Sequence, residues 1–294
     1  MKISTQVIPV AGGRSIWVDS ADFGEGFPVL VHAGSPGSRR LFGPAAQRAA
    51  TQYGLRLISY DRPGFGDTPA QPGRTVASAA AETRAIADGL GLSRLAVWGF
   101  SGGGPYALAC AALLPDLVSA CCVLACLAPY DSPGLDFSAS WSAEHREEVQ
   151  RFFDQPELAR ENFRAEAAEL FEVLTTAEGW LSRWGDAAGT DAAHSREVAE
   201  YLALVQQDCS RQGDQGWWDD WAAFLGPWGF DLAAIRVPVQ LWQGANDTAV
   251  PAAHGHWLAG QIPGVDAHFP EAEDHTNIEA AHQDEAYQWI LERS

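Results

Sequence analysis

The stretch Arg94-Leu-Ala-Val-Trp-Gly-Phe-Ser101-Gly-Gly103 decides the fold. Its first half is a short apolar run, which is typical of a strand buried on both faces of a sheet. Residues 102–114 are rich in small and apolar residues, and they end before Pro115, a residue that cannot continue a helix. The sequence therefore predicts a buried strand, a tight glycine-rich turn at Ser101 and a helix.

Further strands and helices alternate on both sides of this unit. Apolar or β-branched runs of strand length occupy residues 3–10, 15–19, 28–32, 56–60, 119–127, 238–242 and 266–269. Helical patterns occupy residues 39–53, 76–90, 252–261 and 277–293. Strands that alternate with helices favour a parallel sheet covered on both faces. The first two runs, joined through Gly12-Gly13, predict an antiparallel hairpin at the edge. We therefore expect an α/β fold with a mostly parallel, eight-stranded sheet flanked by helices.

This alternation is interrupted between residues 131 and 230, where the sequence is helical, acidic and rich in aromatic residues. The segment holds Trp141, Trp180, Trp184, Trp217, Trp218, Trp221 and Trp228. We expect residues 1–130 and 231–294 to form the α/β core and residues 131–230 to form an inserted helical cap, or lid. Its aromatic side chains either pack the cap itself, as large aromatics usually do, or line a pocket for an apolar substrate.

The composition limits the partners and the compartment. The chain has 38 acidic and 19 basic residues, for a formal net charge of -19. Such a surface repels nucleic-acid phosphates and anionic lipids, so we expect a small-molecule substrate and neither a nucleic acid nor a membrane as partner. The N-terminal residues show no secretory signal, and the five cysteines, four of them in apolar surroundings, favour reduced core thiols. These features predict a cytoplasmic protein, and the sequence leaves a homo-oligomer open.

The turn Gly99-Phe100-Ser101-Gly102-Gly103 has the pattern G-x-S-x-G. Between a strand and a helix this pattern is typical of a nucleophile elbow, in which a strained turn raises the serine hydroxyl above the sheet. Glycine at positions 99 and 103 avoids a clash with the serine side chain. Ser101 is therefore the candidate nucleophile.

A serine hydroxyl needs a base, and the base needs a partner that orients it. His275 lies in a polar loop between the last strand and the last helix, whereas His254, His256, His268 and His282 fall inside predicted helices or strands. Asp247 follows the strand at 238–242, and Asp131, after the strand at 119–127, is the alternative acid. The order Ser101, Asp247, His275 is the order in which an elbow serine, an acid and a histidine occur in this type of fold.

An oxyanion that forms during acyl transfer needs two backbone N–H donors aimed at one point. The amide of Gly102, directly after the nucleophile, is the first candidate. The second is the amide of Ser35 in His32-Ala-Gly-Ser-Pro-Gly37, because Pro36 has no N–H to donate. The alternative is that this segment is a plain strand–helix connection.

Five segments together resemble the α/β-hydrolase superfamily. They are His32-Ala-Gly-Ser-Pro-Gly-Ser38, Tyr60-Asp-Arg-Pro-Gly-Phe-Gly66, Gly99-Phe-Ser-Gly-Gly103, Gly244-Ala-Asn-Asp247 and Asp274-His275. The resemblance is closest to the cap-bearing branch of esterases, C–C bond hydrolases, proline iminopeptidases and epoxide hydrolases. Two positions depart from the family pattern, because Ala33 stands where a histidine is usual and Asp274 where a glycine is usual.

The resemblance implies an α/β-hydrolase fold and a serine hydrolase, with a carboxylesterase acting on a small, apolar ester-like substrate as the main expectation. Epoxide hydrolases and haloalkane dehalogenases of this fold use an aspartate nucleophile, so Ser101 excludes their chemistry here. Ser101, Asp247 and His275 would form an acyl-enzyme without a metal or an organic cofactor. Two alternatives remain: a C–C bond hydrolase or aminopeptidase with the same three residues, and a small-molecule receptor built on a hydrolase scaffold.

Overall fold

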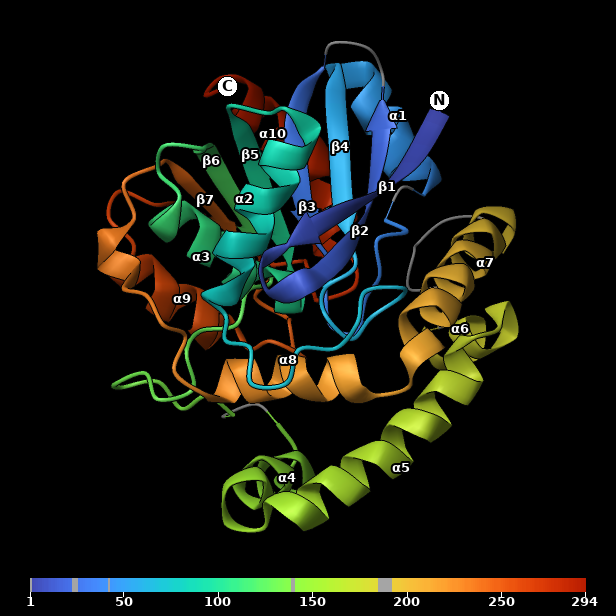
Figure 1. Ribbon diagram of the computed structural model, residues 1–294. Coiled ribbons are helices and arrows are strands. Elements are labelled where there is room, and N and C mark those ends of the chain that lie inside the picture. The colour runs from blue at the N-terminus through green and yellow to red at the C-terminus, as the bar shows by residue number, and fades with distance from the viewer. Residues whose placement is uncertain (1, 23–25, 42, 139–140, 185–191) are drawn as a thin grey trace.

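The computed structural model describes residues 2–22, 26–41, 43–138, 141–184 and 192–294. Eight strands form one sheet in the order β1-β2-β4-β3-β5-β6-β7-β8 (Figure 1). They span Lys2–Val10 (β1), Arg14–Asp22 (β2), Phe27–His32 (β3), Leu55–Tyr60 (β4), Leu95–Phe100 (β5), Val118–Leu124 (β6), Val239–Trp242 (β7) and Asp266–His268 (β8). The prediction of a mostly parallel, eight-stranded sheet is confirmed.

The sheet is parallel from β4 to β8, and its first two strands form the predicted edge hairpin. β1 pairs with β2 in antiparallel register, from Lys2 opposite Asp22 to Val10 opposite Arg14, and β2 pairs antiparallel with β4. β5 lies between β3 and β6, and both pairs are parallel. Because parallel strands end at the same edge of a sheet, the loops after β3, β5, β7 and β8 gather there.

Helices cover both faces of the sheet. α2 (Ser78–Leu90), α3 (Gly104–Leu113) and α9 (Ala252–Gln261) pack on one face, where Ile86, Leu108 and Leu258 join its core. α1 (Pro44–Tyr53) and α10 (Ile278–Leu291) pack on the other face, where Ala50 and Ile290 are fully buried. Strands covered on both faces must be apolar throughout, which explains the uninterrupted apolar runs of the sequence.

Five helices fill the long connection between β6 and β7. They are α4 (Ala143–Asp154), α5 (Pro156–Leu174), α6 (Ala177–Trp184), α7 (Ala192–Cys209) and α8 (Gln215–Leu225). Figure 1 shows α8 crossing below the sheet, with α4 at the bottom, α5 rising from it to the right, and α6 and α7 on the right-hand side. No strand occurs in the described part of residues 131–230, in agreement with the helical pattern there. That these helices act as a cap stays a prediction.

The turn after β5 has the strained geometry that its sequence predicts. Ser101 has a φ of 53°, in the left-handed region that few residues other than glycine adopt, at a cost of about 1–3 kcal/mol. A Cβ at Gly99 would lie 2.6 Å from the carbonyl oxygen of Gly103, and a Cβ at Gly103 would overlap the carbonyl oxygen of His32. The nearest atoms at both positions are backbone atoms, so the two glycines allow backbone to pack on backbone around the serine.

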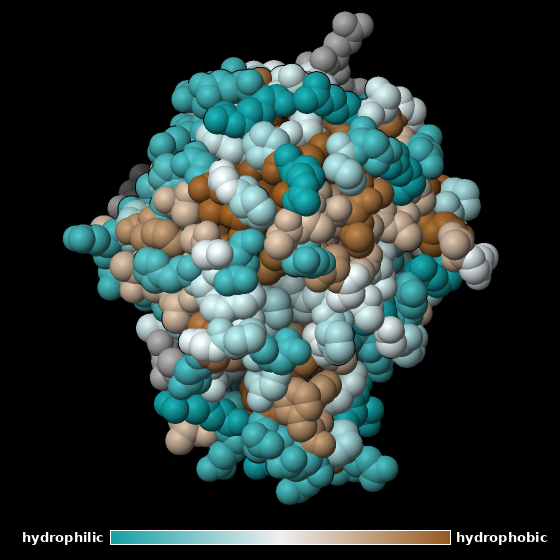
Figure 2. Space-filling model, turned by 90° about the vertical axis from the view of Figure 1, so that its left-hand side faces the viewer, coloured by the Kyte–Doolittle hydropathy of each residue, from teal (hydrophilic) through white to brown (hydrophobic). Residues whose placement is uncertain are grey.

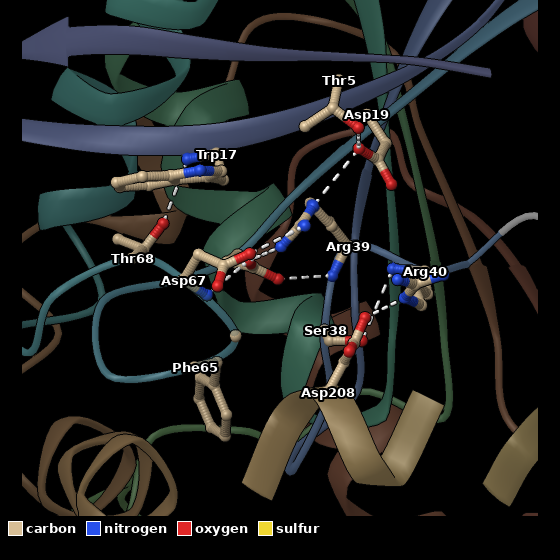
Figure 3. A network of polar contacts seen from close by, with 12 residues as sticks. Thr5, Trp17, Asp19, Ser38, Arg39, Arg40, Phe65, Asp67, Thr68 and Asp208 are labelled. Atoms are coloured by element: carbon tan, nitrogen blue, oxygen red, sulfur yellow. Dashed lines mark hydrogen bonds and ion pairs between the residues drawn. The ribbon is translucent and has the colours of Figure 1, made fainter. Parts of the chain in front are cut away.

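The helix predicted to begin at Arg39 begins instead at Pro44. Arg39 is buried and donates from Nε to Asp19 (3.2 Å) and from Nη2 to Asp67 (2.9 Å), and it also forms an ion pair with Asp61 (Figure 3). The backbone amide of Arg39 donates to Asp61 as well, at 2.8 Å. These contacts replace the first helical turn, and Pro44 then starts the helix at a position where its missing N–H costs nothing.

The remaining surface and core features follow the composition. All five cysteines are free and buried, so the sequence's indication of core thiols is confirmed. On the face shown in Figure 2, hydrophobic residues gather in patches between hydrophilic ones. Among the described residues, none of the helices combines the length and the apolar character that crossing a bilayer requires.

The packing at Gly103 predicts a large loss of stability on substitution. Gly103→Ala should lower the free energy of unfolding by at least about 2 kcal/mol, because a methyl group has no space between two backbone segments. Gly260→Ala is the control: this helical glycine has nothing within 4 Å of an added Cβ, so alanine should stabilise by up to about 1 kcal/mol. Urea unfolding of both variants measures the difference. Equal effects would contradict the packing argument.

Candidate active site

The structure brings Ser101, His275 and Asp247 together at the ends of three strands. Ser101 follows β5, Asp247 lies in the loop after β7, and His275 lies in the loop after β8. Nε2 of His275 is 3.0 Å from Oγ of Ser101, and Nδ1 of His275 is 2.8 Å from Oδ2 of Asp247. With a proton on Nδ1, the imidazole can accept the serine proton at Nε2.

Asp247 is held rigidly by its own loop. Its side chain is buried, and Oδ1 accepts from the backbone amides of Ala249 (2.9 Å) and Val250 (2.7 Å). Oδ2, the oxygen that faces His275, also accepts from Nε2 of Gln243 at 3.1 Å. Each carboxylate oxygen therefore accepts hydrogen bonds from its surroundings, and the rotamer that meets the histidine is fixed.

The loops that carry Asp247 and His275 are joined by their backbones. The amide of Asn246 donates to the carbonyl of Glu273 (3.1 Å), and its side chain donates to the carbonyl of Glu271 (2.7 Å). Asp274, which departs from the family pattern, accepts from the amide of Thr276 at 2.7 Å and so shapes the turn after the histidine. The departure leaves the position of His275 intact.

The alternative acid and the other histidines lie elsewhere. Asp131 is exposed, and no contact joins it to His275 within the described residues. His254 is buried in α9, where both ring nitrogens contact backbone groups and burial lowers its pKa. His256 lies in α9, His268 in β8 and His282 in α10, as their sequence contexts predicted.

The two predicted oxyanion donors lie side by side. A Cβ built on Gly102 would be 3.2 Å from the backbone nitrogen of Ser35 and 3.1 Å from the ring of Phe224, which comes from α8. Gly34, one residue earlier, lies close enough that its Cβ would contact the Cβ of Ser101 at 3.7 Å. Among the described loops and turns, no backbone hydrogen bond uses the Ser35 amide.

A buried carboxylate that the sequence analysis missed lies directly behind this loop. Asp220 of α8 accepts at Oδ2 from Oγ of Ser35 (2.5 Å) and from Nη2 of Arg62 (2.7 Å). At Oδ1 it accepts from Nη2 of Arg74 (2.5 Å) and from the hydroxyl of Tyr106 (2.6 Å). Burial opposes the ionisation of Asp220, yet Arg62 and Arg74 hold its pKa at about 2. It is therefore anionic throughout the neutral range.

Arg62 also holds the backbone of the loop that carries Ser35. Nη1 of Arg62 donates to the carbonyl of Ala33 (2.6 Å), and Nη2 donates to the carbonyl of Gly34 (2.8 Å). Three consecutive residues, 33–35, are thus held: Arg62 binds the carbonyl oxygens of the first two, and Asp220 binds the hydroxyl of the third. The one sequence signal for Asp220 is an acidic pair, Asp219-Asp220, inside an otherwise aromatic and apolar helix.

Ser101 and His275 open onto a cavity of about 560 Å³. Helices α5, α6 and α7 contribute the lining residues Leu174, Trp180 and Leu202. Of the tryptophans of segment 131–230 whose side chains the structure describes, Trp180 alone lines this cavity, and the side chain of Trp184 lies outside the described part. Most of the described aromatic side chains of this segment pack on one another, as Trp217 and Trp218 do against Phe163.

A second cavity of about 170 Å³ lies within the helices of the insertion. His145, Glu148 and Glu166 line it, and their potential ligand atoms lie within 4.8 Å of one another. These side chains are exposed or half-buried, and they are not among the residues that line the Ser101 cavity. Surface carboxylates often gather without a metal, so we assign them no role.

Comparison with known proteins agrees with this architecture. Over 104 residues the chain is 33% identical to the "Putative non-heme bromoperoxidase BpoC" of Mycobacterium tuberculosis. This match covers 35% of the chain, and the chain spans 40% of the length of that relative.

Several solved structures resemble this chain over nearly their whole length. An alpha/beta hydrolase fold protein from Nakamurella multipartita is 24% identical with a TM-score of 0.66, and the match covers 98% of both chains. The epoxide hydrolase VrEH1 from Vigna radiata is 18% identical with a TM-score of 0.72, covering 99% of this chain and 98% of its own. The esterase RhEst1 from Rhodococcus sp. ECU1013 is 18% identical with a TM-score of 0.67, covering 99% and 100%.

At these sequence identities the similar structures establish the fold alone, so the reaction must be inferred from the side chains of the site. The family described as alpha/beta hydrolase fold matches residues 28–283, which is most of the sheet and the whole of the site. The chain belongs to the alpha/beta hydrolase fold family.

Proposed function

We propose that this protein is a serine hydrolase that cleaves a small, apolar ester-like substrate through an acyl-enzyme on Ser101. The observation that carries the proposal is the continuous chain of contacts from Ser101 to His275 (3.0 Å) and from His275 to Asp247 (2.8 Å). The serine at the elbow selects acyl transfer, because it can attack a carbonyl carbon and leave an ester bond to the enzyme.

In the first half of the reaction, His275 takes the proton from Ser101 as its Oγ attacks the carbonyl carbon. Asp247 accepts from Nδ1 of His275, fixes the tautomer and stabilises the imidazolium. The carbonyl oxygen becomes an oxyanion, which the amides of Ser35 and Gly102 bind. His275 then gives its proton to the leaving alcohol, and the acyl group stays on Ser101.

In the second half, a water molecule replaces the alcohol. His275 removes a proton from this water as it attacks the acyl carbon, and the same two amides bind the second oxyanion. The proton then returns to Oγ of Ser101 as the acid leaves. Every proton in this sequence is held by the substrate, the water, Ser101 or His275, so the steps balance without a further group.

We assign the segment 131–230 the role of a cap over this reaction. The support for this role is the cavity itself, because helices α5, α6 and α7 provide part of its wall above Ser101. A wall of leucine side chains and Trp180 favours an apolar acyl or alkyl group and lowers the local dielectric, which strengthens the oxyanion contacts.

Ser101→Ala should lower kcat for a p-nitrophenyl ester by about 10³-fold or more, because the covalent route is lost. A fluorophosphonate reagent should label the wild type once, on Ser101, and should not label the variant. Mass spectrometry of the labelled peptide locates the adduct. An adduct on another serine, or activity within tenfold of the wild type, would refute the nucleophile. Binding of the ester without any release of p-nitrophenol would instead support a receptor.

Asp247→Asn should slow hydrolysis far more than Asp131→Asn. An amide in place of Asp247 favours the wrong tautomer of His275, which in related sites costs up to about 10⁴-fold in kcat. Asp131 is exposed and does not contact the histidine, so its amide should change kcat by less than about twofold. Steady-state kinetics on both variants makes the comparison, and the reverse ranking would move the acid to the loop after β6.

Asp220→Asn should lower kcat by about tenfold or more and change KM much less, because a displaced Ser35 amide weakens binding of the transition state only. The control is Asp219→Asn, one residue earlier on α8, where the carboxylate accepts from Gln215 and not from Ser35. Circular dichroism checks that both variants fold. Equal kcat values in the two variants would remove Asp220 from the positioning of the oxyanion loop.

A further inference from the structure

One wall of the Ser101 cavity holds a carboxylate that the proposed mechanism does not use. Glu279 lies in the first turn of α10, four residues after His275, and its side chain lines the same cavity. Its Oε1 accepts from Nε1 of Trp98 at 3.2 Å. Among the described residues, no other donor contacts this carboxylate, which leaves Oε2 for a ligand.

The cavity has no positive side chain to neutralise Glu279. Among the described residues that line it, Glu279 is the one acidic residue, and neither arginine nor lysine occurs there. Arg62 lies nearby behind the oxyanion loop, but it is buried and already paired with Asp220. With Glu279 ionised the cavity would carry a net negative charge, which would disfavour carboxylate substrates and favour cations.

The residues that line the cavity with Glu279 on this side are apolar or uncharged. Trp98 and Tyr287 are almost fully buried, at 1% and 2% exposure, and their rings pack on each other at 4.8 Å, so they form an apolar wall rather than a free aromatic face. Phe100, which also lines the cavity, lies 5.1 Å from the ring of His275. Walls of this kind lower the local dielectric, which strengthens the attraction between the carboxylate and an ammonium group.

Burial raises the pKa of Glu279, while the hydrogen bond from Trp98 and the nearby His275 act in the opposite direction. A carboxylate that lies against protein without a cationic partner is unfavourable, because its lost hydration is not replaced. A cation in the cavity would supply that partner and favour the ionised form.

We propose that Glu279 binds a cationic nitrogen at one end of an otherwise apolar substrate, so that the substrates are esters carrying an ammonium group on the acyl or the alcohol side. This inference rests on the proposed hydrolysis at Ser101 and narrows its apolar substrate class to esters with one charged end. The ammonium would pair with Oε2 of Glu279, while the ester carbonyl faces Ser101.

Two matched pairs of esters test the inference. In the first pair the charge is on the alcohol (thiol) side: butyrylthiocholine is compared with its uncharged isostere, S-(3,3-dimethylbutyl) thiobutyrate. In the second pair the charge is on the acyl side: a p-nitrophenyl ester whose acyl chain ends in trimethylammonium is compared with its uncharged tert-butyl analogue. In the wild type, kcat/KM should be at least tenfold higher for the cationic member of one pair. In Glu279→Gln, whose amide oxygen can still accept from Trp98, this ratio should fall to about one.

The control is Glu292→Gln, which removes the same charge at the exposed end of α10 and should leave both ratios unchanged. If Glu279 acts only through His275, the variant slows both members of a pair equally and the unchanged ratio overturns the proposal. Hydrolysis without any preference for the cation also overturns it, while the proposed hydrolase function stands.

A binding measurement covers the case in which no ester is hydrolysed. Titration calorimetry with butyltrimethylammonium should give a Kd at least tenfold lower for the wild type than for Glu279→Gln, whatever the outcome at Ser101. Equal Kd values, or no binding to the wild type, would overturn the cation site. Binding that depends on Glu279 without ester hydrolysis would support the cation site and refute the hydrolase.

Discussion

The buried ion pair between Asp220 and Arg62 is the interaction on which the site depends. Asp220 comes from α8, in the insertion, whereas Arg62 follows β4 in the core and donates in turn to the carbonyls of Ala33 and Gly34. Arg74 adds a second positive charge to the same carboxylate. The loop that carries Ser35, which we propose to bind the oxyanion, is therefore positioned by a charge located in another part of the chain.

Burying these charges is unfavourable by several kcal/mol per ion unless each is fully paired, and here the pairing is nearly complete. Both oxygens of Asp220 accept two or more hydrogen bonds, and the low pKa of its carboxyl shows that the arginines outweigh the effect of burial. Removing one partner from such a pair usually costs about 3–5 kcal/mol, because the other charge is left buried. These contacts hold α8 firmly against the core, and they thereby fix the position of Ser35, whose hydroxyl donates to Asp220.

Features set by neighbouring residues could be predicted from the sequence, and features set by distant ones could not. The strand, turn and helix around Ser101 follow from local pattern, and the loop contexts of Asp247 and His275 singled out these two residues. The start of α1 could not be predicted, because Arg39 is held extended by carboxylates far along the chain. Asp220 and Glu279 were missed for the same reason, since only the folded chain brings each to the site.

The three residues proposed for the chemistry lie on loops of the core, and the wall of the cavity comes partly from α5, α6, α7 and α10. An epoxide hydrolase and an esterase both share this fold, so the fold by itself does not fix the reaction. Glu279 makes no hydrogen bond to His275 in the described structure, so its substitution would remove none of the contacts that join His275 to Ser101 and Asp247. Asp220 differs, because it comes from α8 and accepts directly from Ser35. Substitutions in the wall would therefore alter what the cavity accepts, whereas loss of the α8 carboxylate would release the loop that we propose to bind the oxyanion.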